Sequence, residues 1–234
     1  MPVLVALIFA AVTGALAPLY IRLFRGELAR EDLMRTAATG LGFSFARGDP
    51  LYPGNTALRL PFEIFSRGTE QTCENVMSGM LDGVAVQAFD FLYVLRVETR
   101  DGVSMSEPLR YSCAVATIGG DHPHVVIEPA SDLALESHDV VRLEWGDFNA
   151  RYRVRSSDRG FVPELLDLDL MAWLVDEAPP LALTWELQRD RLLCRAPALA
   201  PERYGDLVRA VVTFAGYVRT RASEKTLRFD PPQP

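Results

Sequence analysis

The chain has 234 residues, with 24 Lys and Arg against 31 Asp and Glu, so its formal net charge is −7. Hydrophobic residues make up 49% and charged residues 24%, which excludes a disordered, collagen-like or disulfide-scaffold chain. The negative balance argues against nucleic acid as a partner, because a protein that binds it needs a basic surface to neutralise phosphates. The length fits one globular domain with an appendage.

The N-terminal segment is the strongest single signal in the sequence. Residues 2–21 carry no charged side chain, and about 20 residues at about 1.5 Å each span the roughly 30 Å of a bilayer's hydrocarbon core. The segment therefore predicts one transmembrane helix, with the membrane as partner. Two alternatives are a buried soluble helix and a signal peptide cleaved after Ala17. The second lacks the usual basic start, since no Lys or Arg precedes Arg22.

The flanking charges predict the orientation of this helix. Arg22, Arg25, Arg30 and Arg35 follow the apolar run, and only the terminal amine precedes it. Because positive residues stay on the cytoplasmic side, the N-terminus is expected outside and the bulk of the chain in the cytoplasm. No second apolar run of this length occurs, so we expect a single-pass protein of the cell membrane.

By composition, the chain divides into four parts. We expect a transmembrane anchor, then a juxtamembrane helix (26–41) and loop (47–57), then a globular domain and a flexible tail. The corresponding ranges are 1–24, 25–57, 58–225 and 226–234.

The first half of the domain reads as successive antiparallel strands. Asp82-Gly83 separates alternating runs at 73–80 and 84–98 and is typical of a hairpin. A strand at 109–118 is expected to reverse at Gly119-Gly120-Asp121 into a short strand at 124–128.

Further along, strands and helices alternate. The sequence predicts a hairpin of 140–145 with 148–156, then a helix pair with caps at Asp158 and at Asp167 or Asp169. A second hairpin is expected to turn at Arg189-Asp190, between 181–187 and 191–196. The last helix begins at Pro201, because proline suits a first helical turn.

These elements predict an α+β fold. A mainly antiparallel β meander carries an inserted helix pair and ends in a C-terminal helix, and no repeated strand–helix alternation indicates a doubly wound sheet. The alternative is a pleckstrin-homology-like curved sheet closed by the last helix.

Several stretches together resemble a known family. They are Asn75–Asp90, Tyr111–Cys113 with Pro123–Ile127, Phe148–Val154 with Asp158, and Met171–Leu174. Their order is similar to a family of uncharacterised, single-pass, membrane-anchored actinobacterial proteins, and the resemblance covers most of residues 60–175. It departs at Glu144–Asp147, where the family has a more acidic run containing serine. The resemblance implies the anchor and the domain, and no activity or catalytic residue.

The sequence offers little for catalysis. Cys73, Cys113 and Cys194 are widely spaced and form no metal-binding or disulfide pattern. His122, His124 and His138 are the only histidines, and with nearby carboxylates they could hold zinc or iron. Pro123 disfavours this, because it lies in a predicted turn, with His122 in the turn and His124 at the start of the next strand. We expect no catalytic residue and no cofactor.

One carboxylate stands out. Asp90 falls on the apolar side of the long strand, and an unpaired buried carboxylate costs several kcal/mol, so an arginine partner is expected. Arg151, Arg153 and Arg155 alternate along one predicted strand and could form either this ion pair across the sheet or an anion-binding surface.

These observations favour a single-pass membrane protein with a cytoplasmic binding or scaffold domain for a protein or lipid headgroup. One alternative is a membrane-tethered, metal-dependent hydrolase that uses the histidines. The other is an extracytoplasmic binding module.

Overall fold

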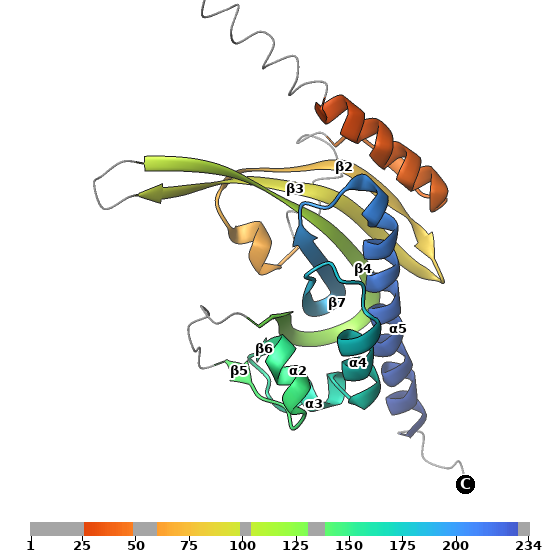
Figure 1. Cartoon of the computed structure of the whole chain (residues 1–234). Coiled ribbons are helices and arrows are strands. Elements are labelled where there is room, and N and C mark those ends of the chain that lie inside the picture. The colour runs from red at the N-terminus through yellow and green to blue at the C-terminus, as the bar shows by residue number, and fades with distance from the viewer. Residues whose placement is uncertain (1–25, 49–59, 99–103, 131–138, 229–234) are drawn as a thin grey trace, which may run out of the picture.

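The computed structural model describes residues 26–48, 60–98, 104–130 and 139–228 (Figure 1). A helix over residues 26–40 comes first and is called the first helix below. The elements that follow are β1 (Ser44–Ala46), η2 (Glu63–Ser66), β2 (Thr69–Leu81), β3 (Val84–Glu98), β4 (Ser104–Pro129), β5 (Val140–Val141), α2 (Gly146–Arg151), β6 (Tyr152–Ser156), α3 (Phe161–Leu165), α4 (Leu168–Ala172), η3 (Trp173–Glu177), β7 (Thr184–Pro197), η4 (Pro201–Arg203) and α5 (Tyr204–Arg228).

The predicted anchor at residues 2–21 lies outside the described ranges. Among the helices within those ranges, none combines the length and the apolar content that crossing a bilayer requires.

The strands form one antiparallel sheet. Its order is β1-β2-β3-β4-β6-β5, and β7 pairs with β4. The predicted hairpin at Asp82-Gly83 is confirmed: it joins β2 to β3, and these residues have φ of 49° and 72°. Positive φ at both central positions is what a two-residue hairpin turn needs.

The long strand β4 bends in its middle without reversing. Gly119 and Gly120 have φ of 77° and 80°, and the register between β4 and β7 shifts between Thr117 and Val125. Extra residues on one strand form a bulge, which bends the strand. The predicted chain reversal at 119–121 is therefore wrong. The first half of β4 pairs with β3, and the second half pairs with β6.

The predicted hairpin at Arg189-Asp190 is also wrong. Residues Thr184–Pro197 form the single strand β7, which follows β4 through its bend and pairs with both halves. Arg189 takes a positive φ of 53° where the register shifts. The charged dipeptide looks like a turn in sequence, but the residues on either side of it have the same partner strand.

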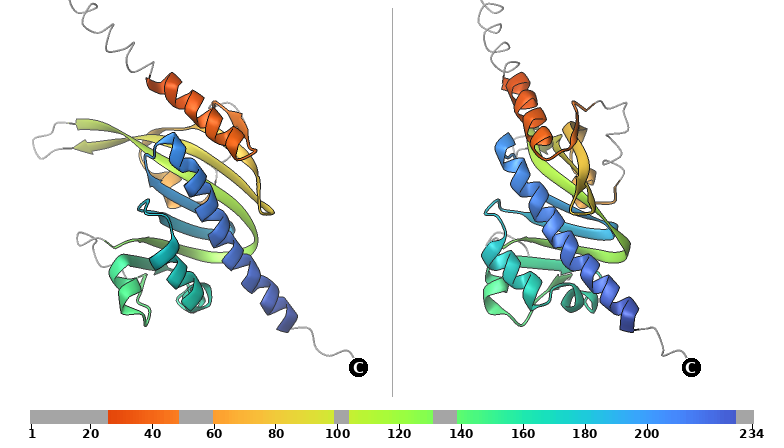
Figure 2. Two further views of the ribbon diagram at one scale, coloured as in Figure 1. Left: turned by 45° about the vertical axis from the view of Figure 1, so that its right-hand side comes forward. Right: turned by 90° about the vertical axis from the view of Figure 1, so that its right-hand side faces the viewer.

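The two sides of the sheet are covered unequally. The helix α5 crosses one side (Figure 2) and contributes to the larger core, which also contains Met34 and Ala38 of the first helix. On the other side, η2 packs Phe65 edge-on against Phe91 of β3, with ring centroids 5.1 Å apart. The predicted α+β class, with its mainly antiparallel sheet and C-terminal helix, is confirmed. The pleckstrin-homology-like alternative stays a prediction.

Residues 140–177 contain the sheet strands β5 and β6 together with several short helices. The strands β5 and β6 pair as predicted, but Gly146–Arg151 is the helix α2 rather than strand. Asn149 explains this, because its Nδ2 donates to the carbonyl oxygens of Leu143 and Trp145 at 2.6 and 2.9 Å. The predicted helix pair is confirmed as α3 and α4. Asp167 caps α4 by accepting from the Leu170 N–H at 2.9 Å.

Replacing glycine by alanine is expected to change the free energy of unfolding in opposite directions at Gly79 and Gly216. A Cβ at Gly79 of β2 would lie 2.3 Å from the ring of Phe43, which is buried, whereas a Cβ at Gly216 of α5 would meet nothing within 4 Å. We expect Gly79→Ala to lower the free energy of unfolding by about 1–3 kcal/mol through overpacking. Gly216→Ala should raise it by about 0.5–1 kcal/mol through helix propensity.

Urea unfolding of the two variants checks this pair of expectations. Equal effects of the same sign would contradict the packing described for β2.

Candidate functional site

Asp90 of β3 is the centre of a buried polar network. The residue is fully buried, and the Arg30 guanidinium donates to it twice, from Nε to Oδ2 at 2.8 Å and from Nη2 to Oδ1 at 2.7 Å. The Tyr204 hydroxyl donates to Oδ1 at 2.6 Å, and the Asn75 Nδ2 donates to Oδ2 at 2.9 Å. Four hydrogen bonds from three elements thus satisfy one carboxylate. The first helix supplies Arg30, whose bidentate guanidinium makes two of the bonds, β2 supplies Asn75 and α5 supplies Tyr204.

Local geometry explains why these side chains converge. Asn75 has a positive φ of 52°, which asparagine tolerates better than most residues. It lies where the register between β2 and β3 shifts, so the bulge turns its amide toward Asp90. The first helix is fixed further by the Arg30 Nη1, which donates to the carbonyl oxygen of Leu199 at 2.9 Å. The Leu199 N–H in turn donates to Ser112 Oγ at 2.9 Å.

The charges in this network stabilise each other. Burial alone would raise the pKa of Asp90, but the hydrogen bonds from Arg30 and Tyr204 and the charge of Arg30 outweigh it, so the pKa lies below its ordinary value. The hydrogen bond with Asp90 raises the pKa of Arg30. Asp90 is therefore a buried carboxylate, paired with a guanidinium whose side chain is only 15% exposed.

The prediction that Asp90 has an arginine partner is confirmed, but the choice of arginine is wrong. Arg151 ends α2 and donates to the carbonyl oxygen of Val175 at 2.6 Å. Arg153 pairs with Glu128, with Nε to Oε1 at 2.8 Å, and Arg155 pairs with Glu63, with Nη2 to Oε2 at 2.8 Å. The partner is Arg30, which lies 60 residues away from Asp90 in a different element.

The three arginines therefore do not share one strand, and carboxylates lie against two of them. Arg155 also has Asp139 Oδ2 at 3.4 Å and Glu128 Oε1 at 3.5 Å. An anion-binding role for Arg151, Arg153 and Arg155 stays a prediction, and any anion would have to compete with these carboxylates.

A second polar network holds η2 to the sheet. His124 Nε2 lies 2.8 Å from Oε1 of Glu186, whose side chain is 2% exposed. The same oxygen accepts from the Glu63 N–H at 2.8 Å, so β4, β7 and η2 meet at one carboxylate. The hydrogen bond with Glu186 raises the pKa of His124, and burial opposes this. Sequence patterns did not single out Glu186, because it lies within a run that alternates like any strand.

The histidines do not converge. His122 Nε2 lies 3.0 Å from the carbonyl oxygen of Gly119, whereas His124 contacts Glu186, and His138 lies outside the described residues. Across the described ranges, no three His, Cys, Asp or Glu side chains are placed to hold a metal ion. Cys73, Cys113 and Cys194 are buried and free, and burial raises the pKa of Cys73 to about 12.

Comparisons with known proteins establish the fold. No protein-family model and no curated protein sequence matches the chain. Among solved structures, the chain is similar to the crystal structure of the mycobacterial trehalose monomycolate transport factor A, TtfA, with a TM-score of 0.60 and 18% identity. The match covers 87% of this chain and 97% of that one. At this identity the likeness shows a shared α+β fold, and the resemblance to the actinobacterial family stays a prediction.

Removing Asp90 should be costly. Asp90→Ala leaves the Arg30 guanidinium largely buried without a carboxylate, so we expect a loss of about 3–5 kcal/mol in the free energy of unfolding. Asp206→Ala is the matched control, because Asp206 pairs with Arg203 and Arg209 at the surface. It should cost at most about 1 kcal/mol. Urea unfolding measures both, and similar losses for the two variants would show that the Asp90 network contributes no more than a surface pair.

The pair of His124 and Glu186 should make stability depend on pH. Because the folded-state pKa of His124 is raised, its contribution is complete below the ordinary value of about 6.5 and is lost as pH rises through the folded value. The difference in unfolding free energy between the natural chain and His124→Gln should therefore be larger at about pH 5.5 than at about pH 9.

His122→Gln controls for the loss of an imidazole as such. A difference for His124→Gln that stays constant or widens as the pH rises would contradict the assignment of the raised pKa to this pair.

Proposed function

We propose that this chain is a single-pass membrane protein whose α+β domain serves as a binding or scaffold domain at the cytoplasmic side. In this proposal, residues 2–21 cross the membrane, and the first helix holds the domain in a fixed position relative to it. The observation that carries the proposal is the network around Asp90, which joins the first helix to β2, β3 and α5.

The position of the first helix supports this role. The uncharged run ends at Ile21 and the described helix is present from residue 26, so only a few residues separate the proposed anchor from the folded domain. Arg30 and Met34 are then held against Asp90 and the larger core. A tether that only keeps a domain near a membrane needs no such attachment, whereas a scaffold that presents one surface does.

The comparison with a known structure supports a role in lipid transport. The similar structure is that of a mycobacterial trehalose monomycolate transport factor. We propose by analogy of fold that this chain is an accessory factor in lipid transport, with a lipid headgroup as the bound group. The analogy rests on the shared fold alone.

Topology is the first measurement to make. A reporter that is active only in the cytoplasm, fused after Pro234, should give signal, and a reporter that requires export should not. This outcome follows from the excess of arginine after residue 21. Signal from the exported reporter alone would overturn the cytoplasmic placement and favour the extracytoplasmic binding module. A chain lacking residues 2–21 is the control, and it should leave the membrane fraction.

A further inference from the structure

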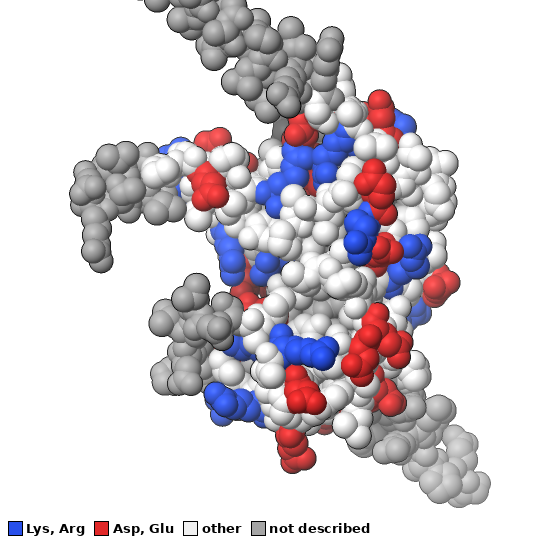
Figure 3. All heavy atoms as spheres, in the orientation of Figure 1, with Lys and Arg blue, Asp and Glu red and all other residues white. Residues whose placement is uncertain are grey.

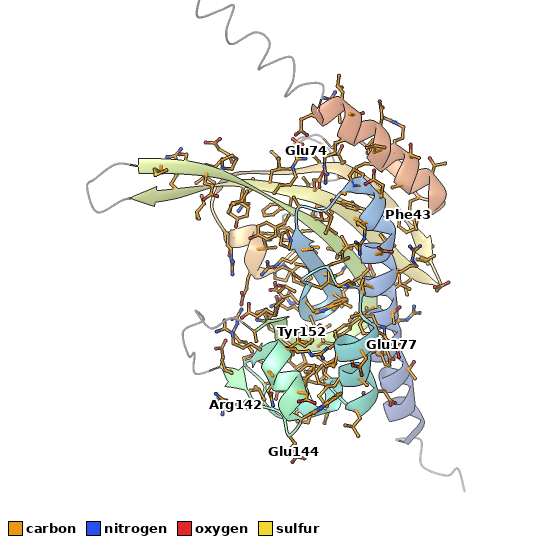
Figure 4. The ribbon with its side chains drawn as sticks, in the orientation of Figure 1. Phe43, Glu74, Arg142, Glu144, Tyr152 and Glu177 are labelled. Atoms are coloured by element: carbon orange, nitrogen blue, oxygen red, sulfur yellow. The ribbon has the colours of Figure 1, made fainter. Side chains whose placement is uncertain are left out.

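A charged pocket lies between the first helix and the sheet, next to the Asp90 network. Its volume is about 400 Å³, which lies within the range of sites for small molecules. Three carboxylates, of Glu27, Glu31 and Glu74, and two guanidiniums, of Arg47 and Arg110, line it. Figure 3 shows basic side chains gathered below the first helix on the face in view, and Figure 4 shows Glu74 beneath that helix.

The ionisable groups of this pocket are unequally satisfied. Arg110 Nη2 lies 2.9 Å from both carboxylate oxygens of Glu27, so this pair is complete. Among the described residues, the Arg47 side chain has one ion-pair partner: its Nε lies 3.2 Å from Glu31 Oε2, and the side chain is 67% exposed. Its two terminal nitrogens make no hydrogen bond to a described residue, so they can face an anionic group.

Among the described residues of this pocket, Glu74 is the ionisable group that lacks a partner. Its side chain is half-buried, and no described residue gives it a hydrogen bond or an ion pair within 4 Å. Burial raises the pKa of Glu74, and the charges of Glu27 and Asp90 add to this, although those of Arg110 and Arg47 oppose it. A half-buried carboxylate in a cavity is stabilised by a cation or an N–H donor that enters the cavity.

We propose that this pocket binds a small zwitterion of the ethanolamine phosphate type. The ammonium group would donate to Glu74, and the phosphate group would pair with the exposed guanidinium of Arg47. An ammonium of this kind has the N–H donors that a carboxylate accepts, and a guanidinium is suited to phosphate oxygens. Leu92 of β3 and Leu28 supply apolar wall between the charged groups, where the short carbon link would lie.

The position of the pocket near the proposed membrane anchor favours a lipid headgroup over a soluble zwitterion. This choice rests on the proposed function. Leu28 at the pocket comes seven positions after Ile21 in the sequence. Even a fully extended chain of that length spans at most about 25 Å. Whatever the conformation of these residues, the pocket stays close to the membrane surface if residues 2–21 span the bilayer.

Calorimetric titration of the full chain in detergent micelles tests the proposal. O-phosphoethanolamine should bind saturably, and phosphocholine should bind at least tenfold more weakly because its nitrogen has no N–H. Glu74→Gln and Arg47→Gln should each raise the dissociation constant at least tenfold. The matched controls Glu144→Gln and Arg142→Gln, at the far end of the molecule (Figure 4), should leave it unchanged.

The other outcomes are equally informative. The proposal is overturned if O-phosphoethanolamine does not bind, if phosphocholine binds as tightly, or if Glu74→Gln and Arg47→Gln, shown by thermal melting to be folded, bind normally. Dihexanoyl phosphatidylethanolamine that binds at least tenfold more tightly than the free zwitterion would identify a lipid source, and equal affinity would identify a soluble one.

Binding in micelles does not depend on topology. An exported reporter together with binding would therefore refute the cytoplasmic placement alone, and cytoplasmic signal without binding would refute the pocket alone.

Discussion

A carboxylate with no access to water lies where the first helix and α5 pack on the sheet, and its charge is balanced by groups from several elements at once. Asp90 belongs to β3, and its donors come from the first helix, from β2 and from α5. Each donor reaches Asp90 only when its own element is in place. Displacing any of these elements would therefore leave the buried carboxylate with fewer hydrogen bonds. Buried ion pairs add little net stability compared with apolar packing, but breaking one is expensive. The contribution of this network is therefore to the position of the first helix more than to the total stability.

On the opposite side of the sheet, the second network also joins several elements through one buried carboxylate. Glu186 is buried in β7 and is shared by the His124 imidazole and the Glu63 main chain, so the short η2 segment is attached through a carboxylate as well as through Phe65. In the Asp90 network the cation is the guanidinium of Arg30, which stays charged, whereas Glu186 is paired with the imidazole of His124, which can lose its proton. The two sides of the sheet therefore respond differently to acidity, although both depend on one buried acid.

Local signals in the sequence predicted much of the fold, and the failures share one cause. Asp82-Gly83, the cap at Asp167 and the buried position of Asp90 depend on residues close in sequence, and the structure confirms them. The continuity of β7 depends on the strand with which it pairs, whose partner residues lie 58 or more positions away in the sequence. A bend and a chain reversal at Gly119-Gly120 both need positive φ, so the same two glycines favour either one. The partner of Asp90 was missed for the same reason: Arg30 lies in a helix, outside any strand periodicity.

The first helix also bears on how such a protein changes during evolution. Met34 and Ala38 are part of the larger core, and Phe45 of β1 pairs with Met77 of β2. The segment between the apolar run and the sheet is thus a piece of the domain rather than a spacer. A recombination that replaced only residues before 26 would keep every contact of the first helix described above. A junction after residue 30 would replace the arginine that Asp90 contacts, so we expect the first helix and the sheet to be inherited together.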